Sequence, residues 1–415
     1  MTSYRWMICA LLFFATTVNY IDRAVLAILK PLLEKELGWT QLEYGNMVTA
    51  FQLTYALGYV FSGRLIDRIG VRLGFTLSVS LWSVAAMAHA AARTVFGFSF
   101  ARAGLGLAEG GMFPAAIKTV AEWFPKEERA FVTGLFNAGS NIGAVTCPLI
   151  VPWLATTWGW QAAFVATGAV GFVWVAAWLL IYRSPESHPR VSPAELAHIR
   201  KDPPDPAGKI PWLVLLRHRQ TWAFVVGMAA SSPIWWFYIF WAPDFLNKRY
   251  ELGLTQSSLP LMIMFLAASF GGIGGGWLSS KLLKLGWSVN AARKTALLVC
   301  ALCVVPVVAT PFVANPWVAV SLVGLAAAAH CGFAANLFTL VSDTVPKQGI
   351  SSVVGIGGMA GALGGMFFAQ LVSRVLQVTN NNYVVPFAIA SMAYIFALAI
   401  MHLLVPKLER LELSA

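Results

Sequence analysis

Four ionisable side chains lie inside long apolar stretches of the sequence: Asp22 beside Arg23, and Arg102 seven residues before Glu109. A charge deep in a membrane costs several kcal/mol, so such residues are candidates for binding and proton transfer. The flat guanidinium of an arginine matches a carboxylate with two parallel hydrogen bonds. A carboxyl group in a low-dielectric cavity can load and release a proton near neutral pH. The four residues therefore predict a site that binds an anion and exchanges protons.

A single pair of helices would bring these side chains together. At about 1.5 Å per residue, Asp22 lies roughly 24 Å along its helix from the predicted inner end. Arg102 and Glu109 lie roughly 8 Å and 18 Å from the predicted outer end of theirs, and two turns of separation put both on one face. We expect the helix of Asp22 to approach closely at the small residues there, which are Gly104, Gly106, Gly110 and Gly111.

The alternative is a purely structural network, in which Asp22 pairs with Arg102 and Arg23 pairs with Glu109. Such buried pairs exist, and the loss of one partner is strongly destabilising. The residue types alone leave both interpretations open.

The elements that position these residues are membrane spans. The chain has 415 residues, of which 58% are hydrophobic and 11% charged, against about a quarter charged in soluble proteins. The first apolar block has no small-residue cleavage site, so we interpret it as a retained span. Apolar windows long enough to cross a bilayer predict an all-α membrane protein with twelve spans, at about 6–32, 41–63, 73–92, 97–123, 129–154, 160–182, 219–246, 256–280, 292–313, 316–342, 348–375 and 383–405.

The distribution of positive charge predicts the orientation. Of the 29 Lys and Arg residues, 21 fall on the side of the N-terminus, six on the other side, and Arg23 and Arg102 within spans. This asymmetry satisfies the positive-inside rule with both termini cytoplasmic. The net charge of +11 is thus a topology signal, and we expect no nucleic-acid partner.

A long polar gap at 182–212, rich in Pro and charge, divides the spans six and six. We predict an N-terminal six-helix bundle over 1–183, a cytoplasmic linker over 184–218 and a C-terminal six-helix bundle over 219–415. The similar segments 62–74 and 275–288 follow the second span of each half, as two repeated halves require.

The five cysteines, Cys9, Cys147, Cys300, Cys303 and Cys331, all fall in apolar blocks. Cys300-x-x-Cys303 has no second pair and no nearby His, so we predict neither a disulfide nor a metal site.

The segment "GRLIDRIGVR" (63–72) resembles the loop 2–3 signature of the major facilitator superfamily. The resemblance implies that Gly63 allows close helix packing, that Asp67 lies near a helix terminus, and that Arg68 and Arg72 belong to a basic cluster. In that family these residues gate conformation and do not bind substrate.

Longer strings resemble one branch of that family, the anion:cation symporters, which include bacterial sugar-acid transporters and animal carriers of sialic acid, phosphate and glutamate. These are "NYIDR" at 19–23, "RAGLGLAEGGMFPAA" at 102–116 and "EWFPKEERAFVTGLFNAGSNIGA" at 122–144. Three more strings, "WWFYIFWAPDFL", "ANLFTLVSD" and "GIGGMAGALGGM", are similar to hexuronate transporters.

The resemblance implies roles for the ionic residues. Arg23 would coordinate the substrate carboxylate, and Asp22 and Glu109 would carry protons. Arg102 would modulate these carboxyl groups and contribute to the anion site. Tyr20 and Tyr55 match positions that line a sugar-acid pocket, where a tyrosine offers a hydroxyl and an apolar ring.

Further polar residues are weaker candidates for substrate contacts. Asn137 and Ser140 face inward on plausible helical faces, although some relatives carry Gln where this chain has Ser140. Asn336 and Thr339 form, with Asp343, one polar stripe on a span. They would recognise substrate hydroxyls or simply make hydrogen bonds between helices, and Asp343 lies near the predicted inner end as a gate or cap.

These observations predict a proton-coupled symporter that imports a hexuronate (galacturonate or glucuronate) by alternating access, as a monomer in the inner (plasma) membrane, without a cofactor. Another organic anion, such as galactonate or glucarate, and anion exchange are the alternatives. Arg23 and Arg102 argue against export of cationic drugs. No nucleotide loop, His-rich metal spacing or nucleophile elbow appears, so we expect no enzyme.

Overall fold

The structure is a computed structural model that describes residues 4–201, 211–409 and 411. Within those ranges all regular structure is helical, and the chain forms two compact units. The first unit contains residues 1–29 and 50–205, and the second contains 30–49 and 206–415. Residues 202–210 of the predicted linker lie outside the described ranges.

Two long helices contribute residues to both units. The first, α1 (Tyr4–Leu37), passes from the first unit to the second at Leu29–Lys30, and the next, α2 (Gln41–Ile69), returns at Thr49–Ala50. Pro31 lies inside α1, next to this division. Because proline has no amide hydrogen, α1 lacks one backbone hydrogen bond at that point.

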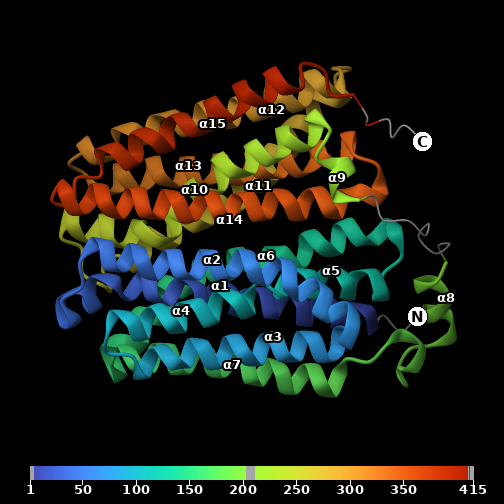
Figure 1. Cartoon of the computed structure of the whole chain (residues 1–415), viewed down its shortest axis with the longest axis horizontal. Helices are drawn as coiled ribbons and strands as arrows, with labels where there is room; N and C mark the ends of the chain where they lie inside the picture. The colour runs from blue at the N-terminus through green and yellow to red at the C-terminus, as the bar shows by residue number, and fades with distance from the viewer. Residues whose placement is uncertain (1–3, 202–210, 410, 412–415) are drawn as a thin grey trace. The chain divides into compact units, whose positions relative to one another are not determined.

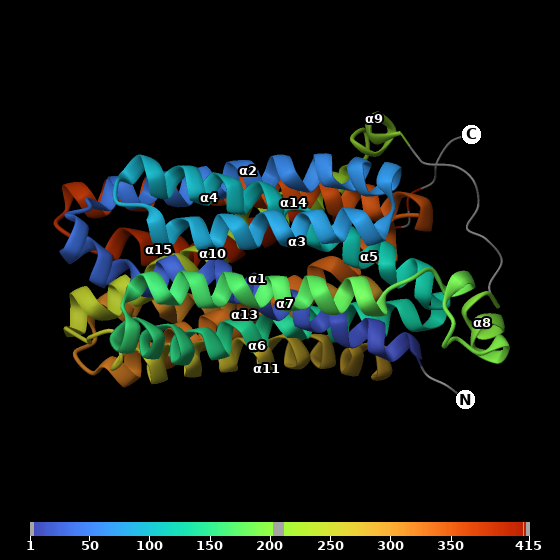
Figure 2. The ribbon, with the colours of Figure 1, turned by 90° about the horizontal axis from the view of Figure 1, so that it is seen from below.

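The rest of the first unit is a helix bundle in which aromatic side chains fill the contact between α3 and α7. α3 lies along α7, as both views show (Figures 1 and 2). Trp174 and Trp178 of α7 stack on each other and contact Phe75 of α3, and Trp174 Nε1 donates to the Leu11 carbonyl at 2.7 Å. Its elements after α2 are α3 (Val71–Ala88), α4 (Val95–Glu109), α5 (Met112–Trp123), α6 (Lys126–Trp158), α7 (Trp160–Ile181), α8 (Pro193–Ile199) and the 3-10 turns His89–Ala91 and Pro185–Ser187.

The short helix α8 belongs to the folded part of the first unit. Ser192 caps its N-terminus by accepting from Glu195 N. The buried Glu195 lies 3.5 Å from the guanidinium of Arg5 at the start of α1, and His198 contacts Glu128 of α6 at 2.9 Å. The segment after α7 is therefore held to the starts of α1 and α6.

The second unit packs its helices through glycines. α11 crosses α13 so closely that a Cβ on Gly275 would lie 2.3 Å from the Cα of Gly332, and α10 lies along α14 (Figure 1). Its elements are α9 (Trp212–Leu215), α10 (Arg219–Tyr250), α11 (Ser258–Lys284), α12 (Val289–Val304), α13 (Pro316–Thr344), α14 (Lys347–Val378), α15 (Val384–Leu404) and the 3-10 helix Val305–Phe312.

Ten of the described helices are long and apolar enough to cross a membrane by length and composition. The predicted spans 41–63 and 97–123 are not among them. The region of the second of these is two helices, because α4 ends at Glu109 and α5 begins after the turn at Gly110–Gly111. The first, α2, carries charged residues toward both ends, so it is less apolar. The count of twelve spans thus stays a prediction.

Candidate functional site

The candidate site of the first unit centres on a buried ion pair between α1 and α4. Arg23 Nε donates to Glu109 Oε2 at 2.9 Å, and Arg23 Nη2 lies 2.8 Å from the same oxygen. The two side chains are only 4% and 0% exposed, so water screens their attraction little. The other carboxylate oxygen of Glu109 has no hydrogen-bond partner in the described residues.

Aromatic rings surround the guanidinium of Arg23. Its central carbon lies 4.8 Å from the ring centre of Tyr20, 4.9 Å from that of Tyr55 and 5.5 Å from that of Phe51. Each such contact is worth about 0.5–2 kcal/mol. Asn19 Oδ1 accepts from Arg23 Nη2 at 3.1 Å. The structure thus places both predicted pocket tyrosines at Arg23.

Arg102 is anchored to the backbone of α1. Its Nη1 and Nη2 donate to the carbonyl oxygen of Arg23 at 3.2 and 3.3 Å, and its guanidinium lies 4.7 Å from the ring centre of Phe51. The side chain is fully buried. Arg102 therefore braces the helix turn that carries Arg23.

Asp22 takes no part in this ion pair. It is 2% exposed, its carboxylate forms no ion pair in the described residues, and the polar side chain of Thr167 lies beside it. The structural alternative therefore holds for Arg23 with Glu109 only, since Asp22 and Arg102 do not pair. The cause is geometric, because neighbouring residues point about 100° apart around a helix.

The glycines at and just after α4 pack against α2 and α3, which corrects the expectation that α1 packs there. A Cβ on Gly106 would lie 2.3 Å from the carbonyl oxygen of Phe51, and one on Gly110 would lie 2.6 Å from Tyr59 N. The close neighbour of α1 is α6, where a Cβ on Gly139 would lie 2.3 Å from the Phe13 carbonyl. The long side chains of Arg23, Glu109 and Arg102 make the hydrogen bonds that link α1 to α4.

The further polar candidates make mostly backbone hydrogen bonds. Ser140 Oγ donates to the Asn137 carbonyl at 2.6 Å, and the Asn137 side chain is exposed. Asn336 Nδ2 donates to the carbonyls of Gly275 and Gly332, both at 2.9 Å, and so ties α13 to α11. Thr339 Oγ1 donates to the Ala335 carbonyl. For Asn336 this is the interhelical alternative, although its Oδ1 has no partner in the described residues.

Asp343, the last member of the polar stripe, forms an ion pair near the end of α13. Its Oδ2 accepts from Arg293 Nε at 2.9 Å, and Arg293 Nη1 donates to Ser279 Oγ at 2.9 Å. Three helices of the second unit are thereby linked at this end.

The loop signature makes contacts between helices of the first unit. Lys118 Nζ donates to Asp67 Oδ1 at 2.9 Å, and Arg72 Nη2 donates to the Leu179 carbonyl at 2.6 Å, while Arg68 is exposed. A Cβ on Gly63 would meet nothing within 4 Å in the described residues, and the close packing expected at Gly63 stays a prediction.

Sequence reasoning missed two ionic residues. Lys30, one of the six basic residues that the charge count above assigns to the side opposite the N-terminus, and Asp244 are each 0% exposed and form an ion pair in the second unit. Asp244 is a lone acidic residue in the apolar run "WWFYIFWAPDFL", and that isolation was an available signal.

Comparisons with known proteins agree with this architecture. The hexuronate transporter of Escherichia coli strain K12 is 30% identical over 377 residues, which cover 89% of this chain and 87% of the relative. A D-galactonate transporter of Escherichia coli O6:H1 is 28% identical, with 90% and 89% covered. A bacterial homolog of the human lysosomal transporter Spinster, solved in an inward-facing and occupied conformation, superposes with a TM-score of 0.76 at 19% identity, with 98% of each chain covered, and so shows the fold.

The family model of the Major Facilitator Superfamily matches residues 12–369. That match spans most of the chain, and it agrees with the helical fold and with the signature at 63–72. The chain therefore belongs to the major facilitator superfamily, a family of membrane transporters and not of enzymes.

Proposed function

We propose that the chain is a proton-coupled symporter that imports a hexuronate, galacturonate or glucuronate, across a bacterial inner membrane. It would work as a monomer with twelve spans and both termini cytoplasmic. Its two repeated halves would alternate access to one site.

The Arg23–Glu109 pair is the observation that carries this proposal. Glu109 forms an ion pair with the guanidinium of Arg23, which is the group that would hold a substrate carboxylate. When Glu109 takes up a proton it loses its charge and releases Arg23, since a neutral carboxyl attracts a guanidinium far less. A substrate carboxylate then takes its place. One proton and one monoanion would load together, and no net charge would be left in the site.

Asp22 is the second candidate for a proton site. Its carboxyl group is buried without an ion-pair partner in the described residues, and a buried carboxylate without a counter-charge is far costlier than a neutral carboxyl. Arg102 donates to the carbonyl oxygen of Arg23, the residue next to Asp22. A movement of Arg23 would therefore change the position of the Asp22 carboxyl group. Proton binding and anion binding would thus be linked through one turn of α1.

The relatives support a sugar acid as the substrate. Hexuronate and D-galactonate, which their names give as substrates, each combine one carboxylate with several hydroxyls. The hydroxyls and rings of Tyr20 and Tyr55 suit such a molecule. Asn137, Ser140, Asn336 and Thr339 are the remaining candidates for hydroxyl contacts. The galactonate relative supports a second candidate function, proton symport of another organic anion.

Uptake into proteoliposomes tests the proposal. Labelled galacturonate, glucuronate, galactonate and glucarate are offered with and without an inward proton gradient. We expect accumulation of a hexuronate that requires the gradient and that the other hexuronate inhibits. Accumulation of galactonate or glucarate alone would favour the second candidate. Exchange that ignores the proton gradient would contradict symport.

A further inference from the structure

A second buried ion pair lies in the second unit, at the end of α1. Lys30 Nζ donates to Asp244 Oδ1, and both side chains are 0% exposed. Lys30 Nζ also donates to Glu34 Oε2, one turn further along α1, at 2.8 Å. The ammonium lies 5.6 Å from the ring centre of Tyr44. Lys30 thus contacts an aromatic ring and two carboxylates, of which Asp244 is fully buried and Glu34 is partly exposed.

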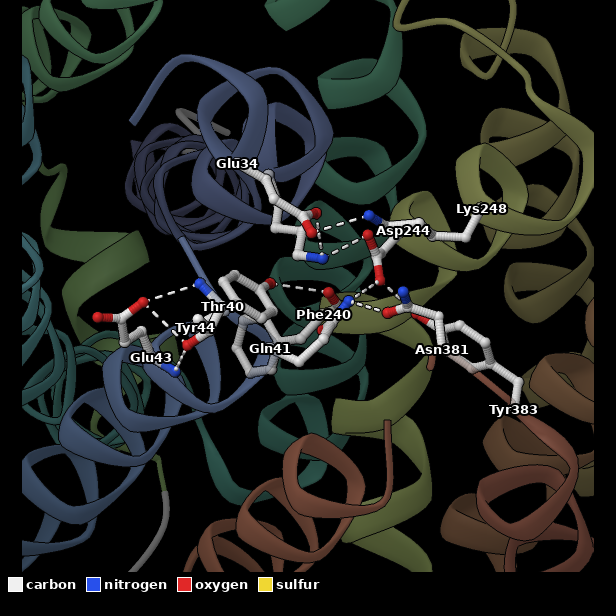
Figure 3. A network of polar contacts seen from close by, with 11 residues as sticks. Glu34, Thr40, Gln41, Glu43, Tyr44, Phe240, Asp244, Lys248, Asn381 and Tyr383 are labelled. Carbon is white, nitrogen blue, oxygen red and sulfur yellow. Dashed lines mark hydrogen bonds and ion pairs between the residues drawn. The ribbon is translucent and has the colours of Figure 1, made fainter. Parts of the chain in front are cut away.

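Asp244 is fixed by uncharged donors as well. Gln41 Nε2 donates to its Oδ2 at 2.9 Å, and Tyr383 donates its hydroxyl to the same oxygen. Gln41 also donates to Asn381 Oδ1 at 2.7 Å (Figure 3). Asp244 of α10 thereby joins the end of α1, the start of α2 and the segment between α14 and α15.

A partly exposed ion pair, between Lys248 and Glu34, lies beside the buried Lys30–Asp244 pair. Lys248 Nζ donates to Glu34 Oε1 at 2.8 Å, and these side chains are 29% and 17% exposed. Exposed pairs contribute little to stability, whereas removing one partner of a buried pair is strongly unfavourable. The Lys30–Asp244 pair therefore dominates this network, and Lys248 offers a matched control.

Lys30 is connected to the candidate site by α1 itself. Arg23 and Lys30 are seven residues apart, which is two turns and roughly 10.5 Å on one face of the helix. Arg23 belongs to the first unit and Lys30 to the second. Pro31 weakens the helix directly after Lys30.

We propose that Lys30 is an outer anion site, which Asp244 occupies in the state shown and which the carboxylate of the incoming sugar acid occupies when the outer side opens. The inference rests on the proposed function and its orientation. Opening would separate residues 30–49 from Asp244, while Glu34 stays with Lys30 on the same helix. Lys30 then keeps Glu34 but loses the hydrogen bond to Asp244 Oδ1, and the carboxylate of the substrate takes the place of Asp244 on the ammonium. The substrate and Asp244 then compete for Lys30, two turns before Arg23.

Competition gives opposite expectations for the two partners. Asp244→Asn removes the internal competitor, which acts at an effective concentration in the millimolar range, so the KM for uptake from outside falls by about tenfold. Lys30→Gln removes the site, so the outside KM rises by about tenfold, and Lys30→Arg restores it. The double variant behaves as Lys30→Gln does. Lys248→Gln, which leaves the buried pair intact, stays within about twofold.

The experiment measures the KM in right-side-out and in inverted membrane vesicles. The proposal predicts opposite shifts of the outside KM and no shift of the inside KM. It is overturned if both variants lower only the maximal rate, or if both shift the KM in the same direction. If Lys30→Gln does not fold, Asp244→Asn alone tests the proposal. A lower outside KM supports it, and an unchanged or higher outside KM overturns it. Failure of the proposed function is distinguishable, because the wild-type chain then takes up no sugar acid, and that result overturns both proposals.

Discussion

Arg23 and Lys30 lie seven residues apart on α1, and the positive charge of each contacts a buried carboxylate from another helix. The partner of Arg23 is Glu109 of α4, and the partner of Lys30 is Asp244 of α10. Under the two proposals above, each of these protein carboxylates is the group that the carboxylate of a sugar acid displaces. The anion would therefore enter by replacing internal carboxylates one after the other.

Arg23→Ala should abolish uptake while the protein still reaches the membrane. Loss of one member of a buried, hydrogen-bonded charge pair corresponds to at least about a thirtyfold loss of binding. Arg23→Lys keeps the charge but loses the planar fork, so uptake should fall by about tenfold. Arg190→Ala, at an exposed position, is the control. Uptake at the wild-type rate by Arg23→Ala would exclude Arg23 as the carboxylate site.

An apolar replacement of the whole pair separates structure from binding. Replacing both partners of a buried ion pair with apolar side chains is often neutral for stability. We expect the double variant Arg23→Met with Glu109→Leu to melt within a few degrees of the wild type and to transport nothing. Thermal unfolding in detergent and proteoliposome uptake check the two parts. Transport by this double variant at the wild-type rate would show that the Arg23–Glu109 pair has only a structural role.

Glu109→Gln should separate substrate movement from proton movement. The amide cannot release a proton, and without a negative charge it competes with the substrate carboxylate for Arg23 far less than Glu109 does. Counterflow of labelled hexuronate should survive, whereas accumulation driven by a proton gradient should fail. Both assays are run on the same proteoliposomes, with Asp22→Asn in parallel. Accumulation at the wild-type level would remove Glu109 from the coupling mechanism.

Gly106→Ala should destabilise the first unit. The new Cβ would lie 2.3 Å from the Phe51 carbonyl oxygen, and overpacking of this kind costs about 1–3 kcal/mol. Gly134→Ala in α6 is the control, because a Cβ there meets nothing within 4 Å, and it should gain about 0.5–1 kcal/mol. Unfolding of the two purified variants gives the comparison, and equal stabilities would contradict the packing of α2 on α4.

The contact of α8 should weaken in acid. Burial alone would raise the pKa of Glu128, but the hydrogen bonds from His198 and Arg5 outweigh it and lower the pKa. A carboxyl group with a lowered folded pKa stabilises the fold above its unfolded pKa of about 4.3 and loses that contribution as the pH falls through the folded value. The melting temperatures of wild type and Glu128→Gln should differ steadily from pH 7 to 5 and converge below about pH 4. A constant gap down to pH 3 would contradict this.

The sequence was sufficient to predict the helical membrane fold and the family, because apolar spans and the signature at 63–72 are local patterns. Helix spacing and depth predicted that the four ionic residues lie near one another, but the Arg23–Glu109 pair was expected only in the structural alternative, together with an Asp22–Arg102 pair that the structure does not form. It did not predict that Lys30 is buried, because its partner Asp244 lies 214 residues away. Nor did it predict that Arg102 binds the Arg23 carbonyl, because every residue has a backbone carbonyl and the residue types therefore do not indicate which one accepts.

Proton uptake on substrate binding tests the exchange of Glu109 for a sugar acid most directly. Purified protein in weakly buffered detergent solution is titrated with galacturonate or glucuronate while the pH is followed. Because linked binding is reciprocal, the wild type should take up about one proton for each anion bound, and Glu109→Gln should bind the anion with correspondingly less uptake. Equal proton uptake by both proteins, or anion binding by the wild type with none, would contradict the account.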